Sequence, residues 1–255
     1  MLIEIGVEYN FRSHIQPMRK LLTAIVLIVA TVAPAFAFQF SPLNTEFAVS
    51  GTNASKIYTV VNDTDEPIAV AVSALKRCVD SDGEEYNEEI PGYFSITPSK
   101  MIVQPQQSQM VRVQYKGPST VTSELAFRIR AEQIPYTKGR DVQGQTINFL
   151  FVYNTSAYVA PSKTVKSAST TAEYDGNGNI GITITNTGNV HQILSELKIT
   201  VKDGNDTYEL TMDDLGRFNG ANLLAGAAFN LSIPVPENFD GSGELEVSAD
   251  WKKTN

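Results

Sequence analysis

Few side chains in this sequence could perform nucleophilic or metal chemistry. After residue 37 the chain holds one histidine, His191, and one cysteine, Cys78. A structural zinc site uses four such ligands, and a Ser-His-Asp triad would depend on the single imidazole. Carboxylates are numerous, but the sequence assigns no pair of them to a cleft. We therefore expect no metal site, no cofactor and no enzymatic activity.

Two acidic segments raise the question of cation binding. Residues 175–179 read Asp-Gly-Asn-Gly-Asn, as at the start of a calcium loop, but Ile180 stands where such a loop needs glycine, and Asn186 where it needs an acid. A hairpin turn explains this segment better. The acidic stretch 80–89 could hold a cation or a basic partner, although a solvated loop is the simpler interpretation. A formal net charge of −8 and the lack of a phosphate-binding glycine loop disfavour nucleic acid and nucleotides.

Strand-type alternation of side chains runs along almost all of 38–255, and no stretch shows a sustained helical stripe. Ile57, Thr59 and Val61 would share one face of a strand, for example, as would Leu125, Phe127, Ile129 and Ala131. The pattern predicts an all-β protein of two immunoglobulin-like β-sandwich domains, residues 38–160 and 161–255. The short, proline-containing connection favours a bent, L-shaped arrangement of the two domains.

Residues 1–37 have the features of an export signal. Arg19 and Lys20 precede an apolar run, and Ala35-Phe36-Ala37 is a small-x-small cleavage site. The apolar run is shorter than the ~20 residues that a membrane-spanning helix needs. Residues 1–17 carry acidic and aromatic side chains that are untypical of a signal, so Met18 is the expected start. The sequence thus predicts a secreted protein.

Residues 146–154 form the most informative segment. Its bulky side chains alternate along one face and are Ile147, Phe149, Phe151 and Tyr153. Leu150 and Val152 make the opposite face apolar as well. Such a strand is either a central core strand that is buried on both faces, or a strand that offers one face and its backbone edge to a partner. Periodicity alone does not choose between them.

Two segments resemble the signature of the periplasmic pilus chaperones, the PapD-like family. They are residues 94–113, with Pro98 and Pro105, and residues 125–135. Residues 182–189 also resemble a strand of the family's second domain, which ends in an Asn-rich turn. The resemblance covers most of 38–255, with the segments in order and at matching spacing. It implies a two-domain immunoglobulin-like chaperone of the periplasm.

The resemblance also implies a mechanism. In that family, the chaperone lends a strand to a pilus subunit whose own sandwich lacks its last strand. Residues 146–154 align with the lending strand, so that its four bulky side chains, Ile147, Phe149, Phe151 and Tyr153, would fill the subunit's groove. The further partner that the resemblance implies is an outer-membrane usher, to which the subunit is passed.

The expected carboxylate anchor departs from the family's best-known branch. There, an arginine on the first strand and a lysine near the end of the lending strand hold the subunit's C-terminal carboxylate, but the matching residues here are Glu46 and Ser156. Arg128 and Arg130 share a strand face and are the candidate anchors, with Lys116 as a further candidate. An ordinary solvated strand face is the alternative for the two arginines. The departure resembles the alternative or archaic chaperone–usher branches.

Two other possibilities stay open. A secreted structural or adhesive module of two immunoglobulin-like domains would use 146–154 as an ordinary core strand. A free chaperone could also cover its apolar strand by forming a homodimer. The chaperone and the adhesive module differ in whether the edge of this strand is available to a partner.

Overall fold

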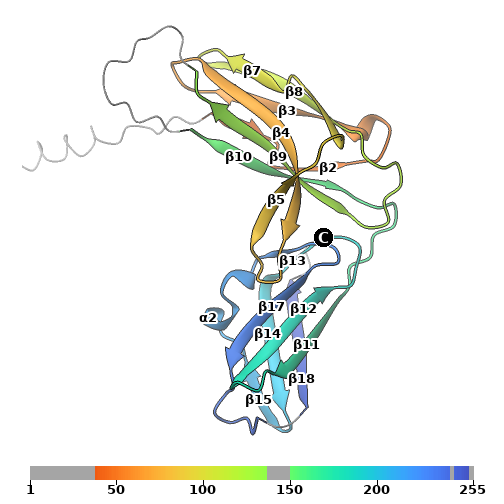
Figure 1. Ribbon diagram of the computed structural model, residues 1–255, viewed down its shortest axis with the longest axis vertical. Coiled ribbons are helices and arrows are strands. Elements are labelled where there is room, and N and C mark those ends of the chain that lie inside the picture. The colour runs from red at the N-terminus through yellow and green to blue at the C-terminus, as the bar shows by residue number, and fades with distance from the viewer. Residues whose placement is uncertain (1–37, 137–149, 242–243, 253–255) are drawn as a thin grey trace, which may run out of the picture. The chain divides into compact units, whose positions relative to one another are not determined.

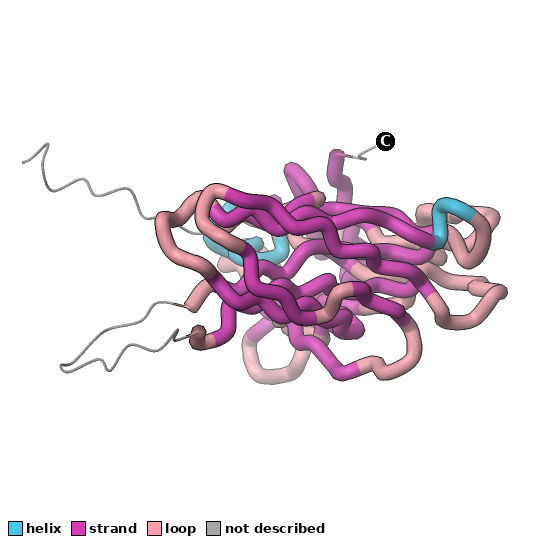
Figure 2. Tube along the Cα trace, turned by 90° about the horizontal axis from the view of Figure 1, so that it is seen from above, coloured by secondary structure: helices cyan, strands magenta, loops and turns pink. Residues whose placement is uncertain are grey.

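Strands and loops predominate in the computed structural model, which describes residues 38–136, 150–241 and 244–252 (Figures 1 and 2). Helix is limited to the short elements η1 (Thr52–Ala54), α2 (Met212–Leu215) and η2 (Gly216–Phe218) within these residues. The prediction of an all-β fold is confirmed. None of the described helices has the length and apolar character to cross a membrane. The predicted export signal lies outside the described residues.

The first sandwich contains strands β1 to β10. One of its sheets has the strand order β1-β3-β8-β6, and the other has the order β2-β10-β9-β4-β5, with β7 paired to β4. The strand bounds are β1 Gln39–Ser41, β2 Asn44–Phe47, β3 Ser55–Asn62, β4 Ile68–Val79, β5 Glu85–Glu89, β6 Phe94–Thr97, β7 Lys100–Val103, β8 Gln107–Tyr115, β9 Leu125–Ile134 and β10 Val152–Val159.

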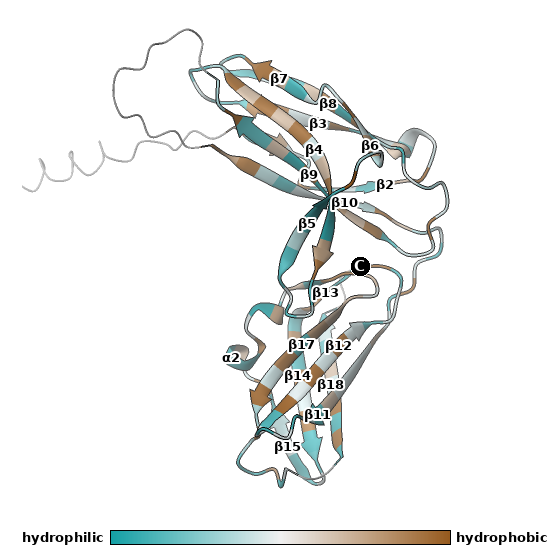
Figure 3. Ribbon diagram, in the orientation of Figure 1, coloured by the Kyte–Doolittle hydropathy of each residue, from teal (hydrophilic) through white to brown (hydrophobic). Residues whose placement is uncertain are grey.

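The core of the first sandwich lies between these two sheets. Alternation on β9 places Phe127, Ile129 and Ala131 in the core, and alternation on β4 places Val70 and Val72 beside them. The same alternation is visible as changing colour along β4 in Figure 3. Each fully buried side chain of this kind stabilises the fold by roughly 1.5–3 kcal/mol. The opposite face carries Arg128 and Arg130 on β9, and Arg77 among mostly apolar residues on β4.

The second sandwich contains the later strands. Its sheets have the orders β11-β12-β17 and β15-β14-β18, with β13 paired to β16. The strand bounds are β11 Ala168–Tyr174, β12 Asn179–Asn186, β13 Gln192–Ile193, β14 Ser195–Asp203, β15 Asp206–Glu209, β16 Asn222–Leu223, β17 Ala228–Pro234 and β18 Leu245–Lys252.

The second sandwich has a core of its own. The buried side chains come from alternate positions of β12, β14 and β17, as Ile182, Ile199 and Leu231 illustrate. Residues 175–179 form the turn between β11 and β12, where Asp175 Oδ1 accepts hydrogen bonds from the backbone N–H groups of Asn177 and Asn179. The predicted domain boundary at residue 160 falls between β10 and β11 and stays a prediction.

Candidate functional site

Strand β10 has one edge that is only partly covered. It pairs antiparallel with β9 along its whole length, from Val152 to Val159. On its other side it pairs in parallel with β2, but only from Ser156 onward. Among the described residues, no strand pairs with this second side of Val152–Thr155.

The direction of the backbone groups follows from the β9 pairing. The carbonyl of Phe151 accepts a hydrogen bond from the N–H of Gln133, which lies opposite it. Because alternate residues of an antiparallel strand bond to the same neighbour, Val152 and Asn154 direct their N–H and C=O groups to the other side. Ser156, two residues after Asn154, follows this alternation, since its N–H donates to the Leu43 carbonyl on the side away from β9. Val152 and Asn154 thus present backbone groups at an open edge.

The bulky side chains of the predicted lending strand lie on the core face where the structure describes them. Phe151 and Tyr153 are half-buried and pack against the first core. The Tyr153 ring meets Phe38 edge to face, with 4.8 Å between ring centroids, and its hydroxyl donates to the Phe38 carbonyl. Ile147 and Phe149 lie outside the described residues. The role of the four residues as a donor strand therefore stays a prediction.

The opposite face of β10 is apolar at its beginning and polar further on. Leu150 and Val152 are 48% and 43% exposed. Asn154 and Ser156 follow on the same face, opposite Arg130 and Arg128 of β9. Arg130 therefore lies opposite the half of β10 that has the open edge, and Arg128 lies opposite Ser156, where the pairing with β2 begins.

Arg128 is held by a carboxylate and a hydroxyl. Its Nε donates to Glu85 Oε1 at 2.6 Å, its Nη2 forms an ion pair with Glu85 Oε2, and its Nη1 donates to Ser156 Oγ at 2.7 Å. The side chain is 15% exposed. Such a two-point contact of a guanidinium with a carboxylate is the strong geometry of arginine recognition. Arg128 thus meets Ser156, the position at which the resembled branch has lysine.

Arg77 of β4 is the member of this site that the sequence did not reveal. Its Nη2 lies 2.8 Å from Glu85 Oε2, and its Nη1 donates to the Tyr158 hydroxyl at 2.8 Å. Only 9% of its side chain is exposed. The Tyr158 hydroxyl also accepts a hydrogen bond from Asn222 Nδ2. We call the guanidinium groups of Arg77 and Arg128 the anion site.

The charge of Glu85 responds to this environment. Partial burial raises the pKa of its carboxyl, but the hydrogen bonds and positive charges of Arg128 and Arg77 outweigh burial, so the pKa lies below its ordinary value. Glu85 is therefore ionised at neutral pH. The anion site holds a carboxylate in the structure as described.

The other candidate anchors are placed differently. Arg130 forms an ion pair with Glu132 at 3.3 Å, and its Nε is buried with no hydrogen-bond partner among the described residues. Lys116 is exposed after β8, which belongs to the opposite sheet. Within the described residues, Lys116 forms no hydrogen bond or ion pair with the anion site. Of the three candidates, only Arg128 belongs to the anion site.

Metal ligation finds no support in the described ranges, where no three His, Cys, Asp or Glu side chains are grouped to hold an ion. Burial raises the pKa of the Cys78 thiol. His191 stacks on Tyr158 with 4.1 Å between ring centroids, and its Nδ1 lies 2.7 Å from Glu124 Oε1. Cys78 is thus a buried thiol, and His191 has structural partners.

The fold and the edge strand define a class of protein, a two-domain immunoglobulin-like β protein with an open strand edge. Residues 39–164 match the family model described as pili and flagellar-assembly chaperone, PapD N-terminal domain. These residues belong to the PapD-like pilus chaperones, a family of chaperones and not of enzymes that acts in the periplasm. The curated proteins contain no match to the chain.

Solved structures of low sequence identity share the fold. The class 5 fimbriae chaperone CfaA is 17% identical, with a TM-score of 0.57 over 85% of this chain and 100% of that one. The CsuC–CsuE chaperone–tip subunit complex of Acinetobacter baumannii gives 10% identity and a TM-score of 0.52, over 77% and 90% of the two chains. The Salmonella enterica SafA pilin–SafB chaperone complex gives 14% identity and a TM-score of 0.50, over 87% of this chain and 99% of that one.

Proposed function

We propose that this chain is exported to the periplasm, where it binds pilus subunits by donor-strand complementation and delivers them to an outer-membrane usher. The open edge of β10 beside the anion site is the observation that carries the proposal. Two proteins of similar fold, CsuC and SafB, are described in complexes with a tip subunit and a pilin. An export signal at residues 1–37, which the sequence predicts, would direct the chain to the same compartment.

The backbone of β10 would supply sequence-independent affinity. Val152 and Asn154 can pair with a subunit strand along the open edge, because their N–H and C=O groups already point there. Ile147 and Phe149, which alternate with Phe151 and Tyr153, would extend the row of bulky side chains into the subunit's groove. Burying each of these side chains stabilises a complex by roughly 1.5–3 kcal/mol.

The anion site would fix the end of the bound subunit. A C-terminal carboxylate carries the same group that Glu85 presents to Arg77 and Arg128, so the geometry suits it. Arg128 is accordingly the proposed anchor, with Arg77 as its partner. Because the anion site and the open edge adjoin the same strand, a subunit whose last residue reaches Ser156 would also run along Val152 and Asn154.

Val152→Pro tests the strand-lending function. Proline removes the N–H that points to the open edge and leaves the hydrogen bonds to β9, and proline is tolerated at the first residue of a strand. We expect at least a tenfold loss of subunit, which corresponds to about 1.4 kcal/mol. The measurement is co-purification of the tagged chain with secreted subunits encoded beside its gene, expressed together in a bacterial periplasm.

Val152→Ala is the matched control, since it shortens the same exposed side chain and keeps the N–H group. It is expected to retain subunit at close to the unmodified level. Circular dichroism and the urea midpoint establish that both variants are folded. Full retention by folded Val152→Pro, or failure of the unmodified chain to retain any subunit, would refute the proposed function.

A further inference from the structure

The anion site of this chain is already occupied by a side chain of the same chain. Glu85 places one carboxylate oxygen on Arg128 Nε and the other between Arg128 Nη2 and Arg77 Nη2. This is the arrangement that an arginine pair offers to a C-terminal carboxylate. A subunit that uses the anion site must therefore first displace Glu85.

The three side chains are not equally buried. Arg77 and Arg128 are 9% and 15% exposed, whereas the Glu85 side chain is 28% exposed. Arg77 has a second partner in Tyr158, and Arg128 has one in Ser156. The arginines can thus keep their positions while the carboxylate leaves. Glu85 is the member of the cluster that a competitor can reach and replace.

The strand that carries Glu85, β5, is hydrogen-bonded to a neighbour on one side. Strand β5 is an edge strand that pairs only with β4 among the described strands, with Glu85 opposite Val79. All five of its residues are exposed. Glu85 follows directly on the turn that joins β4 to β5, in which Asp80 Oδ1 accepts from the N–H groups of Asp82 and Glu84. A rotation of one side chain at the start of an edge strand costs few other contacts.

An empty anion site would be costly. Two guanidinium groups that are this buried would face each other without a counter-charge, and leaving a buried charge unpaired is strongly destabilising. Glu85 is tethered beside them, so its effective concentration is high compared with that of a free carboxylate in solution. Only a carboxylate that is also held elsewhere, as by strand pairing along β10, can compete well.

We infer that Glu85 is a displaceable internal ligand, which fills the anion site in the free chaperone and yields it to the C-terminal carboxylate of a subunit. The inference rests on the proposed function and adds regulation to it. Glu85 would keep small anions off the arginines, and its return would help to release the subunit. The site would thereby select carboxylates that arrive with a pairing strand.

Glu85→Gln tests the inference, because it keeps the size of the side chain and removes its charge. The probe is N-acetylalanine, the smallest mimic of a C-terminal residue, followed by NMR of ¹⁵N-labelled arginine side chains in the full chain. We expect Glu85→Gln to bind N-acetylalanine at least tenfold more tightly than the unmodified chain. The neutral N-acetylalanine amide is expected to bind neither protein.

Glu88→Gln is the matched control. Glu88 lies on the same strand and pairs with Lys76 at an exposed position. The substitution therefore removes an equal charge at a distance from the anion site. It is expected to leave binding of N-acetylalanine unchanged. Adding Arg128→Gln to Glu85→Gln is expected to abolish the gain, which shows that the probe binds at the arginines.

Two outcomes would overturn the inference. One is equal binding of N-acetylalanine by Glu85→Gln and the unmodified chain, and the other is a gain that survives Arg128→Gln. Neither outcome bears on the strand-lending function, which Val152→Pro tests without involving the anion site. Failure of the internal ligand is therefore distinguishable from failure of the proposed function.

Discussion

Asn186→Asp is expected to destabilise the second sandwich by more than about 3 kcal/mol. Asn186 is 1% exposed at the end of β12. Its Nδ2 donates to the carbonyls of Val190, Leu223 and Leu224 at 2.9, 3.0 and 3.1 Å. Aspartate has no donor there and would turn a negative charge toward three carbonyl oxygens. Each buried polar group left without a partner costs about 1–3 kcal/mol.

The first sandwich also has a buried asparagine that donates to three carbonyls, so the same prediction applies to it. Asn62 is fully buried at the end of β3, and its Nδ2 donates to the carbonyls of Glu66, Val103 and Gln104 at 2.8, 3.0 and 3.2 Å. In each sandwich the side-chain oxygen accepts from the backbone N–H two residues later, that of Thr64 or Gly188. Asn62→Asp is therefore expected to cost a similar amount.

Urea unfolding curves measure both effects. Asn62→Ala and Asn186→Ala should lower the free energy of unfolding by less than the aspartate variants do, because they remove the donor without adding a charge. Asn87→Asp at an exposed position of β5 is the control, and a change within about 0.5 kcal/mol is expected for it. Aspartate variants as stable as this control would contradict the prediction.

The importance of these two asparagines was only partly visible in the sequence. Asn186 begins the Asn-rich turn that supports the family resemblance, and Asn62 begins the turn before Pro67. A turn composition, however, does not say which asparagine is buried. That depends on which carbonyls from distant segments, such as Val103 and Leu223, end beside it.

Alternation located the strands well but did not identify the core face in every case. Ile57, Thr59 and Val61 do share one face of β3, as predicted, but Ile57 is 53% exposed, whereas Tyr58 and Val60 between them are fully buried. Both faces of β3 carry apolar side chains, so the pattern is ambiguous. The opposing sheet decides which face is buried.

The anion site shows the same limit at the level of function. The face shared by Arg128 and Arg130 followed from their alternation with Phe127 and Ile129. Arg77 belongs to the site because β4 pairs with β9 in the register that sets Leu75 opposite Arg128. That register joins segments some fifty residues apart and has no local signature. The alternation along β4 could have placed Arg77 on the face that points away from the core, but it could not have placed Arg77 beside Arg128.

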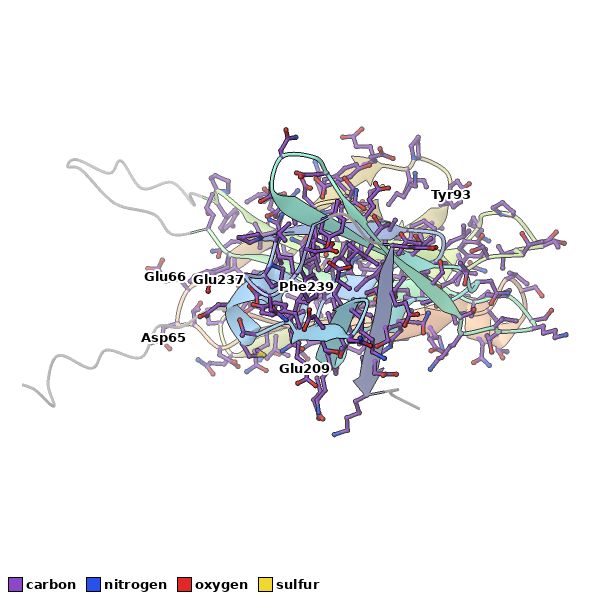
Figure 4. The ribbon with its side chains drawn as sticks, turned by 90° about the horizontal axis from the view of Figure 1, so that it is seen from below. Asp65, Glu66, Tyr93, Glu209, Glu237 and Phe239 are labelled. Carbon is purple, nitrogen blue, oxygen red and sulfur yellow. The ribbon has the colours of Figure 1, made fainter. Side chains whose placement is uncertain are left out.

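Phe127→Ala is expected to destabilise the first sandwich by about 3–5 kcal/mol, the usual loss for a buried phenylalanine. Phe127 is 1% exposed, and its ring centroid lies 5.0 Å from that of Phe94 and 5.8 Å from that of Tyr93, which Figure 4 labels. Phe94 in turn meets Phe47 and Tyr115. Removing the Phe127 ring opens a cavity in the middle of this aromatic cluster.

Two spectroscopic signals can assign the loss to one sandwich. Trp251, the chain's single tryptophan, packs against the second core and reports on it by fluorescence. Near-UV circular dichroism in the tyrosine bands reports mainly on the first core, because four tyrosines belong to it or pack against it and two pack against the second core. With a urea m-value of about 2 kcal/mol/M, the near-UV midpoint should fall by about 2 M while the fluorescence midpoint stays in place.

Phe127→Leu is the control for this prediction, because it retains most of the apolar volume and should cost less than half as much as alanine. The separation of the two signals depends on the two cores being distinct clusters, each with its own buried side chains. Equal shifts of both midpoints would show that the sandwiches unfold as one unit. Separate shifts would mean that core changes in one sandwich leave the other folded, so Val152→Pro can be assessed against an intact second sandwich.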